Sequence, residues 1–231
     1  MEQSKKRFVI PTSKLGVTKP EHKFFEDFLD NDLQELETYL VDLYNTIEAG
    51  EHPRVKKQSH EVSMFEDSGS VTTSMWRDYN VFQFHHPAIR RLFNSVAKMT
   101  REASEYYGYD FDEQLFMIQG WFNVNYVGKG KGKLDWHEHS PIGAPVFHGY
   151  YSVCAEPSET HYKINGREDQ YKINVNKNNR AILSETSHPH AMGDWEWEGP
   201  RITIAYDVLP LGLLMMPDQK LAIEQHWVPL S

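Results

Sequence analysis

The residues that could carry chemistry in this chain are histidines, which are frequent and occur in close pairs. The sequence holds 12 histidines in 231 residues, and one pair is His137 and His139 within Asp135-Trp-His-Glu-His. In extended backbone, side chains two residues apart point the same way, so both imidazoles can reach one metal ion. Asp135 shares their face, whereas Glu138 points to the opposite one. The pair favours a metal site, although a bare pair of this kind also arises by chance.

A second pair, His188 and His190, directly follows the strand-like segment 181–184. Taken alone, this pair is better explained as a polar turn with two solvated imidazoles. The third segment is 201–208, in which apolar residues alternate with polar ones. This period of two predicts a strand with Arg201 and Thr203 on one face. The plainer alternative is a half-exposed strand whose arginine forms a salt bridge.

The order of the three segments favours one particular chemistry. Non-haem Fe(II) oxygenases bind the metal with two histidines and a third ligand, which leaves open positions for a 2-oxo acid and O₂. An arginine on a neighbouring strand then forms a bidentate pair with the distal carboxylate of the 2-oxo acid. His190 followed by Arg201 and the hydroxyl of Thr203 fits this order.

Five motifs together resemble one known family, the 2-oxoglutarate/Fe(II) oxygenases, and most closely its prolyl-hydroxylase-like branch. They lie between residues 115 and 210, and they are Trp121-Phe-Asn-Val-Asn, His137-Glu-His, His148-Gly-Tyr-Tyr-Ser-Val, His190 and Arg201-Ile-Thr-Ile-Ala-Tyr-Asp. The resemblance implies a double-stranded β-helix, or jelly roll, that holds Fe(II) and 2-oxoglutarate at its mouth. It also implies hydroxylation of a substrate with release of succinate and CO₂.

One departure from the family leaves the third ligand open, because the commoner motif ends in a carboxylate where this chain has His139. Either three histidines bind the metal, or Asp135 or Glu138 takes part. We favour His137, His139 and His190, since the first two share a face. His190 is preferred to His188 because its spacing from Arg201 is closer to that of the family.

The remaining candidates concern the co-substrate. Asn123 lies mid-strand on the face of Trp121, where asparagine is disfavoured, so it indicates a polar cavity or a water-facing side. Tyr150 and Tyr151 point to opposite faces, and only one can line a barrel. By analogy with the family we expect Asn123, Tyr151, Arg201 and Thr203 to bind 2-oxoglutarate. His148 is expected to be structural.

The elements that position these residues change character along the chain. Apolar residues spaced by three and four predict helices over 22–48, broken at 30–32, and over 87–107. From residue 114 the period becomes two, which predicts strands at 115–127, 146–154, 159–165, 170–175, 180–184 and 201–208. We therefore expect an α+β fold, a jelly roll supported by N-terminal helices. It would form one domain, with helical support over 1–110, the jelly-roll core over 111–210 and an extension over 211–231.

Composition narrows the function further. The formal net charge of −9 argues against general nucleic-acid binding, and a single cysteine, Cys154, excludes an internal disulfide. No apolar run predicts a secretory signal or a membrane span, so we expect a cytoplasmic protein. We expect it to act on a small molecule or a peptide, and a homodimer is left open. The main alternative is a cupin-type metal-binding protein or dioxygenase. This chain lacks the glutamate that a cupin has shortly after the position of His139. A cupin assignment would also leave Arg201 unexplained. A third alternative is a structural protein that keeps the barrel and leaves the histidines idle.

Overall fold

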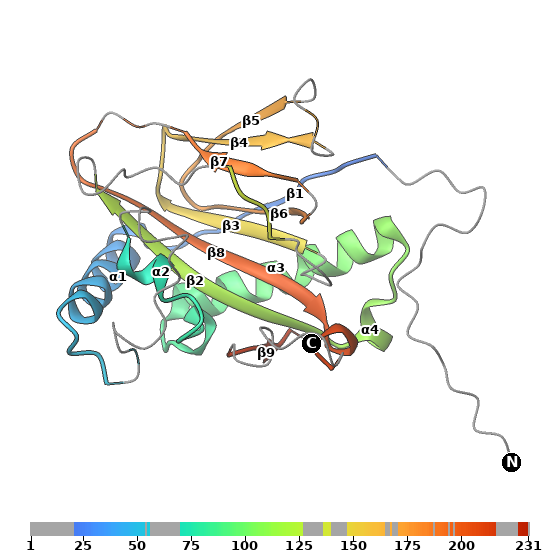
Figure 1. Cartoon of the computed structure of the whole chain (residues 1–231), viewed down its shortest axis with the longest axis horizontal. Helices are drawn as coiled ribbons and strands as arrows, with labels where there is room; N and C mark the ends of the chain where they lie inside the picture. The colour runs from blue at the N-terminus through green and yellow to red at the C-terminus, as the bar shows by residue number, and fades with distance from the viewer. Residues whose placement is uncertain are drawn as a thin grey trace, which may run out of the picture.

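Two antiparallel sheets and a set of helices make up the fold in the computed structural model (Figure 1). The structure describes residues 21–53, 55, 70–126, 136–139, 147–164, 167, 171–186, 188–193, 195, 197–215 and 226–230. In chain order the elements are β1 (Phe25–Phe28), α1 (Leu33–Glu48), α2 (Val71–Ser74), η2 (Val81–Gln83), α3 (Pro87–Tyr107), α4 (Phe111–Gln114), β2 (Phe116–Tyr126), β3 (Phe147–Cys154), β4 (Glu159–Lys163), β5 (Tyr171–Val175), β6 (Arg180–Glu185), β7 (His190–Met192), β8 (Pro200–Pro210), α5 (Leu211–Leu214) and β9 (Val228–Pro229).

The larger sheet has the order β1-β6-β3-β8-β2-β9, and the smaller has the order β5-β4-β7. Helices α1 and α3 pack against the strands of the larger sheet, and Figure 1 shows the smaller sheet on its other side. The larger sheet is therefore a middle layer, with helices on one face and the smaller sheet above the other.

The predicted helix over 87–107 is confirmed as α3. It begins where the sequence indicates, with Pro87 in the first turn and His86 Nδ1 accepting a hydrogen bond from the Ala88 amide at 3.2 Å. It ends at Gly108, whose φ of 77° is in the left-handed region that glycine adopts without strain. Its apolar stripe, with Ile89 among its members, is buried against the sheet.

The predicted helix over 22–48 is only partly correct. The second part is α1, and Asp32 caps it by accepting a hydrogen bond from the Glu35 amide at 3.1 Å. The first part is the strand β1, which pairs antiparallel with β6 from Phe25↔Leu183 to Phe28↔Arg180. Four residues are too few for a period of three or four to be told from a period of two, so pairing with β6 decided the conformation.

The strands predicted from the period of two are all present, with ends shifted by one or two residues. The sequence did not predict β7 or β9. Strand β9 lies within the expected C-terminal extension, yet it pairs with Met117 and Ile118 of β2 and so belongs to the larger sheet. Among the described residues, no helix is long and apolar enough to cross a membrane.

Strands β2 and β8 pair in register along their whole length, and their alternation separates two faces. Gly120 and its partner Tyr206 face Phe82 and hence the helices, because a Cβ on Gly120 would lie 2.5 Å from that ring. Trp121 and Arg201, which alternate with them, line a pocket on the opposite face. The predicted apolar and polar faces of residues 201–208 are therefore the helix side and the pocket side of one strand.

Candidate metal centre

Three histidines converge in the pocket between the two sheets. His137, His139 and His190 each offer a ring nitrogen, and these atoms lie within 4.8 Å of one another. The ring centroids are 4.3 Å apart for His137 and His190, and 5.1 Å apart for His139 and His190. The structure thus brings together the three residues that the sequence favours as metal ligands.

Backbone pairing explains how segments distant in the sequence meet here. His137 and His190 form an antiparallel bridge, in which each backbone amide donates to the carbonyl of the other, at 3.0 and 2.8 Å. His190 also opens β7, which pairs with β4 through Tyr162. The two histidines are therefore fixed side by side by main-chain hydrogen bonds before any ion binds.

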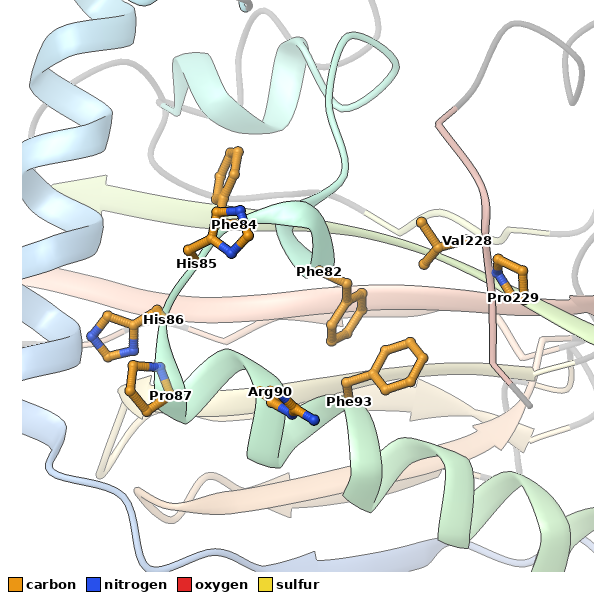
Figure 2. A pocket seen from close by; sticks show the side chains of 9 residues that line it. All are labelled: Phe82, Phe84, His85, His86, Pro87, Arg90, Phe93, Val228 and Pro229. Carbon is orange, nitrogen blue, oxygen red and sulfur yellow. The ribbon is translucent and has the colours of Figure 1, made fainter.

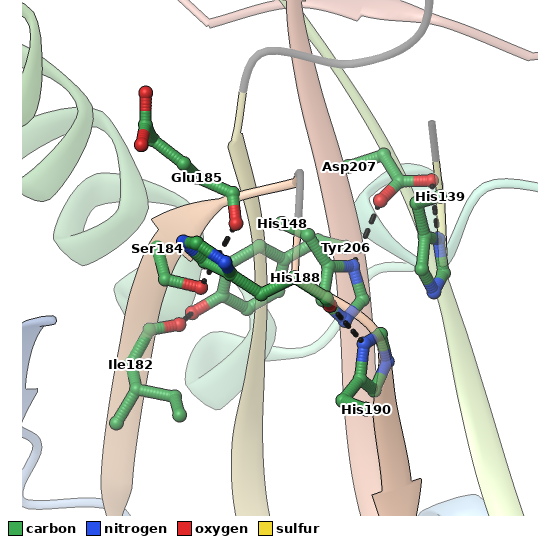
Figure 3. Close-up of polar contacts among 9 residues, drawn as sticks. All are labelled: His139, His148, Ile182, Ser184, Glu185, His188, His190, Tyr206 and Asp207. Atoms are coloured by element: carbon green, nitrogen blue, oxygen red, sulfur yellow. Dashed lines mark hydrogen bonds and ion pairs between the residues drawn. The ribbon is translucent and has the colours of Figure 1, made fainter. Parts of the chain in front are cut away.

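The carboxylate of Asp207 holds two imidazoles at once (Figure 3). Its Oδ2 lies 3.2 Å from His139 Nδ1, and its Oδ1 lies 2.8 Å from His148 Nδ1. Burial alone would raise the pKa of Asp207, but the two imidazoles lower it to about 2. The carboxylate is therefore ionised, and both Nδ1 atoms are the donors.

This arrangement fixes which nitrogen of His139 is available. With its proton on Nδ1, the ring keeps a lone pair on Nε2, which is buried and has no hydrogen-bond partner among the described residues. Burial, with neighbouring imidazoles, also lowers the pKa of His190 well below its usual value and that of His148 to about 4. The rings of His190 and His148 are therefore neutral at neutral pH, and the neutral imidazole is the form that binds a metal ion. The donor set fits Fe(II) or a similar divalent ion.

Arg201 lies in the same pocket as the three histidines. Its side chain is buried, and its Nε donates to Ser158 Oγ at 2.9 Å. Burial lowers its pKa to about 10, although Tyr150 and Tyr162 act in the opposite direction, so it remains a cation at neutral pH. No carboxylate of the described residues pairs with it. A buried, unneutralised guanidinium is costly, and an anionic ligand would remove that cost.

Asn123 and Thr203 lie next to this cation and face each other across β2 and β8. Asn123 Nδ2 donates to Thr203 Oγ1 at 3.0 Å, and Thr73 Oγ1 donates to Asn123 Oδ1 at 2.5 Å. Both residues line the pocket, as the sequence predicts, and the Thr203 hydroxyl keeps its own proton to donate. Their contact with a co-substrate stays a prediction.

Tyr151 was expected in this pocket, and the structure places it elsewhere. Its ring lies on the helix side of β3, where the hydroxyl accepts from Asn31 Nδ2 at 2.9 Å and donates to Asn179 Oδ1 at 2.5 Å. The alternate residue, Tyr150, lines the pocket, with its hydroxyl 2.7 Å from Asn176 Oδ1. The alternation of side chains along a strand shows that the two tyrosines point to opposite faces. Only the assembled sheet shows which face borders the pocket.

The alternative ligands are less well placed. Glu138 is exposed and belongs to no group of converging ligand atoms among the described residues. Asp135 lies outside the described residues. His188 is buried, but it converges with His22 and Glu185 and not with His137.

Sequence reasoning gave no role to Asp207 and treated His148 only as structural. The signal for Asp207 was available, because it alternates onto the same face of β8 as Arg201 and Thr203. His148 could not be placed in the same way, since its contact with Asp207 depends on the pairing of β3 with β8, where the two residues are register partners. The His148 ring, the Asp207 carboxylate and the His139 ring form one hydrogen-bonded unit.

Two hollows differ in what they could do. The pocket with the histidines is a small cavity of about 70 Å³. Another hollow of about 600 Å³ lies where α3 begins (Figure 2). Its lining is mainly aromatic and basic and supplies no group of three converging ligand atoms among the described residues: Phe82, Phe84, His85, His86, Pro87, Arg90, Phe93, Val228 and Pro229. We therefore place the chemistry in the first pocket.

Comparison with known proteins gives similarity in fold alone. No protein-family model and no curated protein matches the sequence. A solved prolyl hydroxylase from Trichoplax adhaerens, in complex with a hypoxia inducible factor peptide fragment, is similar with a TM-score of 0.55 and 11% identity over 86% of this chain and 87% of that one. A prolyl-4-hydroxylase from Pseudomonas putida has a TM-score of 0.50 and 8% identity over 80% and 92% of the two chains.

A third similar structure is a non-heme, alpha-ketoglutarate-dependent carbocyclase from nogalamycin biosynthesis, with a TM-score of 0.50 and 9% identity over 82% and 80% of the chains. The fold of this chain is therefore that of the 2-oxoglutarate/Fe(II) oxygenases. Prolyl hydroxylases are among the structures that share it, in agreement with the branch that the sequence motifs indicate.

Proposed function

We propose that this protein is a 2-oxoglutarate-dependent Fe(II) oxygenase that hydroxylates an unidentified substrate. One observation carries the proposal: three converging imidazoles and the buried cation of Arg201 line one pocket. The first set suits a divalent metal ion, and the second suits a carboxylate held beside it. A 2-oxo acid with a second carboxylate satisfies both.

Each residue has a distinct part in this proposal. His137, His139 and His190 bind the ion and leave the other positions open for small ligands. Arg201 and the hydroxyl of Thr203 bind the distal carboxylate of 2-oxoglutarate, and Asn123 orients that hydroxyl. When bound, Fe(II) and 2-oxoglutarate supply the activation of O₂, with succinate and CO₂ as products.

The fold has a matching part in the proposal. We interpret the six-stranded and three-stranded sheets as the two layers of a jelly roll, with the helices α1 and α3 supporting the larger one. Site residues from both layers then meet at the mouth of the jelly roll, since His190 comes from the smaller sheet and Arg201 from the larger. A cupin-type protein would also use the histidines, but it would leave Arg201 buried without an anion.

The test is anaerobic addition of Fe(II) and 2-oxoglutarate to the full chain. A chelated 2-oxo acid on Fe(II) gives a metal-to-ligand charge-transfer band, and we expect that band with 2-oxoglutarate but not with succinate, which has no keto group. Fe(II) binding without the band would contradict the oxygenase assignment and favour the cupin alternative. Absence of Fe(II) binding would contradict the metal site itself.

The wider setting is proposed on the sequence alone. We propose a small-molecule or peptide substrate, a cytoplasmic location, no membrane association and no general nucleic-acid binding, and a homodimer stays open. Gel filtration with light scattering measures the oligomeric state directly. Screening peptides and small acids for stimulated 2-oxoglutarate turnover distinguishes the two substrate classes.

A further inference from the structure

A second group of metal-ligand side chains lies outside the pocket described above. His22, Glu185 and His188 each offer one ligand atom, and these atoms lie within 4.8 Å of one another. They come from three separate segments: the stretch just before β1, the last residue of β6, and the turn between β6 and β7. Figure 3 shows Glu185 on the side of the view opposite to Asp207 and His139.

The surroundings of this group favour a bound cation. Glu185 is 8% exposed and His188 only 2% exposed, so the carboxylate and one imidazole are removed from bulk water. The His22 ring packs edge-on against His188, with centroids 3.9 Å apart. His22 is half-buried. Two imidazoles and a carboxylate are a ligand set typical of zinc.

We propose that His22, Glu185 and His188 bind a divalent cation of the zinc type, at a site separate from the oxygenase centre. Zinc binds imidazole nitrogen and carboxylate oxygen at about 2.0–2.2 Å, so the three ligand atoms need only small side-chain rotations to reach one ion. A solvent molecule completes the tetrahedron. The site does not depend on the proposed oxygenase function.

Such an ion would cross-link parts of the fold that position the proposed oxygenase centre. It joins the segment before β1 to the turn that leads into β7, and β7 begins with His190. The carbonyl oxygen of His188 lies 3.3 Å from His190 Nδ1, so a fixed turn also orients that ring. Occupation of the second site is therefore expected to stabilise the fold and to hold His190 in place.

The experiment counts Zn²⁺ ions bound to the full chain by equilibrium dialysis and elemental analysis. We expect two ions for the unaltered protein and one for Glu185→Gln, for His22→Ala and for His137→Ala. The matched control is Glu159→Gln, because Glu159 Oε2 lies 2.8 Å from His161 Nε2 and belongs to no group of three converging ligand atoms among the described residues. That variant should keep two ions.

Thermal unfolding separates the two sites. In the His137→Ala background, Zn²⁺ should raise the melting temperature, and adding Glu185→Gln should abolish that rise. The second site is overturned if His137→Ala binds no ion, or if Glu185→Gln and His22→Ala both retain two. If instead Glu185→Gln binds none while His137→Ala keeps one, the second site stands and the first centre is wrong.

Discussion

His137 and His190 exchange both of their backbone hydrogen bonds, so the main chain itself sets two candidate ligands side by side. The ligand positions are thus determined by strand pairing before side-chain rotamers matter. Replacing either side chain leaves that pairing intact, which makes these two histidines good sites for substitution.

We expect His137→Ala and His190→Ala to lose Fe(II) binding while the fold is kept. Each substitution removes one imidazole from the group of three and alters no backbone hydrogen bond. Fe(II) binding is measured by anaerobic titration, and the fold by circular dichroism. His161→Ala, which changes a histidine outside the pocket, should bind Fe(II) normally. If both pocket variants bind iron as tightly as the unaltered protein, the ligand assignment is wrong.

Substitutions in the first motif decide between three histidines and a carboxylate ligand. His139→Asp creates the commoner oxygenase motif and should retain Fe(II), whereas His139→Ala should lose Fe(II) or bind it much more weakly. Glu138→Gln should leave binding unchanged, because that side chain is exposed and outside the cluster. Loss of iron in Glu138→Gln, with iron kept in His139→Ala, would restore a two-histidine, one-carboxylate site.

Arg201→Lys should weaken 2-oxoglutarate binding by about 10- to 100-fold, the loss expected when a charge-assisted bidentate contact becomes a single one. The titration follows the charge-transfer band, with Fe(II) affinity measured separately and expected to be unchanged. Arg101→Lys is the control, since its guanidinium pairs with Asp112 on the surface. An unaltered 2-oxoglutarate affinity would remove Arg201 from the site.

Asp207→Asn should reduce metal affinity by about 10- to 100-fold, as is usual when a residue that orients a ligand histidine is changed. An amide offers an acceptor on one side only, so it cannot accept from the Nδ1 protons of both His139 and His148. One ring must then change its tautomer or its orientation. We expect a shifted charge-transfer band as well, which a purely structural role would not cause. Asp112→Asn, a surface change, is the matched control.

Gly149→Ala should destabilise the fold by about 3 kcal/mol or more, the upper range for overpacking. A Cβ there would lie 2.0 Å from the Ile182 carbonyl oxygen and 2.5 Å from the Tyr206 ring. Urea unfolding measures the change. Gly108→Ala is the comparison, because nothing lies within 4 Å of its Cβ and only the positive φ opposes it, at about 1–2 kcal/mol. Equal losses in the two variants would contradict this packing argument.

The sequence by itself determined the parts of the fold that depend on local pattern. Helix α3 has its proline, its apolar stripe and its closing glycine within one segment. The alternation in 201–208 separates Arg201 and Thr203 from the apolar face, and the spacing of His137 and His139 puts both on one side. In each case the residues that decide the outcome are neighbours in the chain, so periodicity is sufficient.

The tertiary structure alone decided what depends on contacts between distant segments. Pairing with β6 made residues 25–28 a strand, and the orientation of β3 placed Tyr150, not Tyr151, in the pocket. The contact of Asp207 with His139 and His148 likewise needs three segments to meet. A period of two states that neighbouring side chains face opposite ways, but which way is inward follows only from what packs against the sheet.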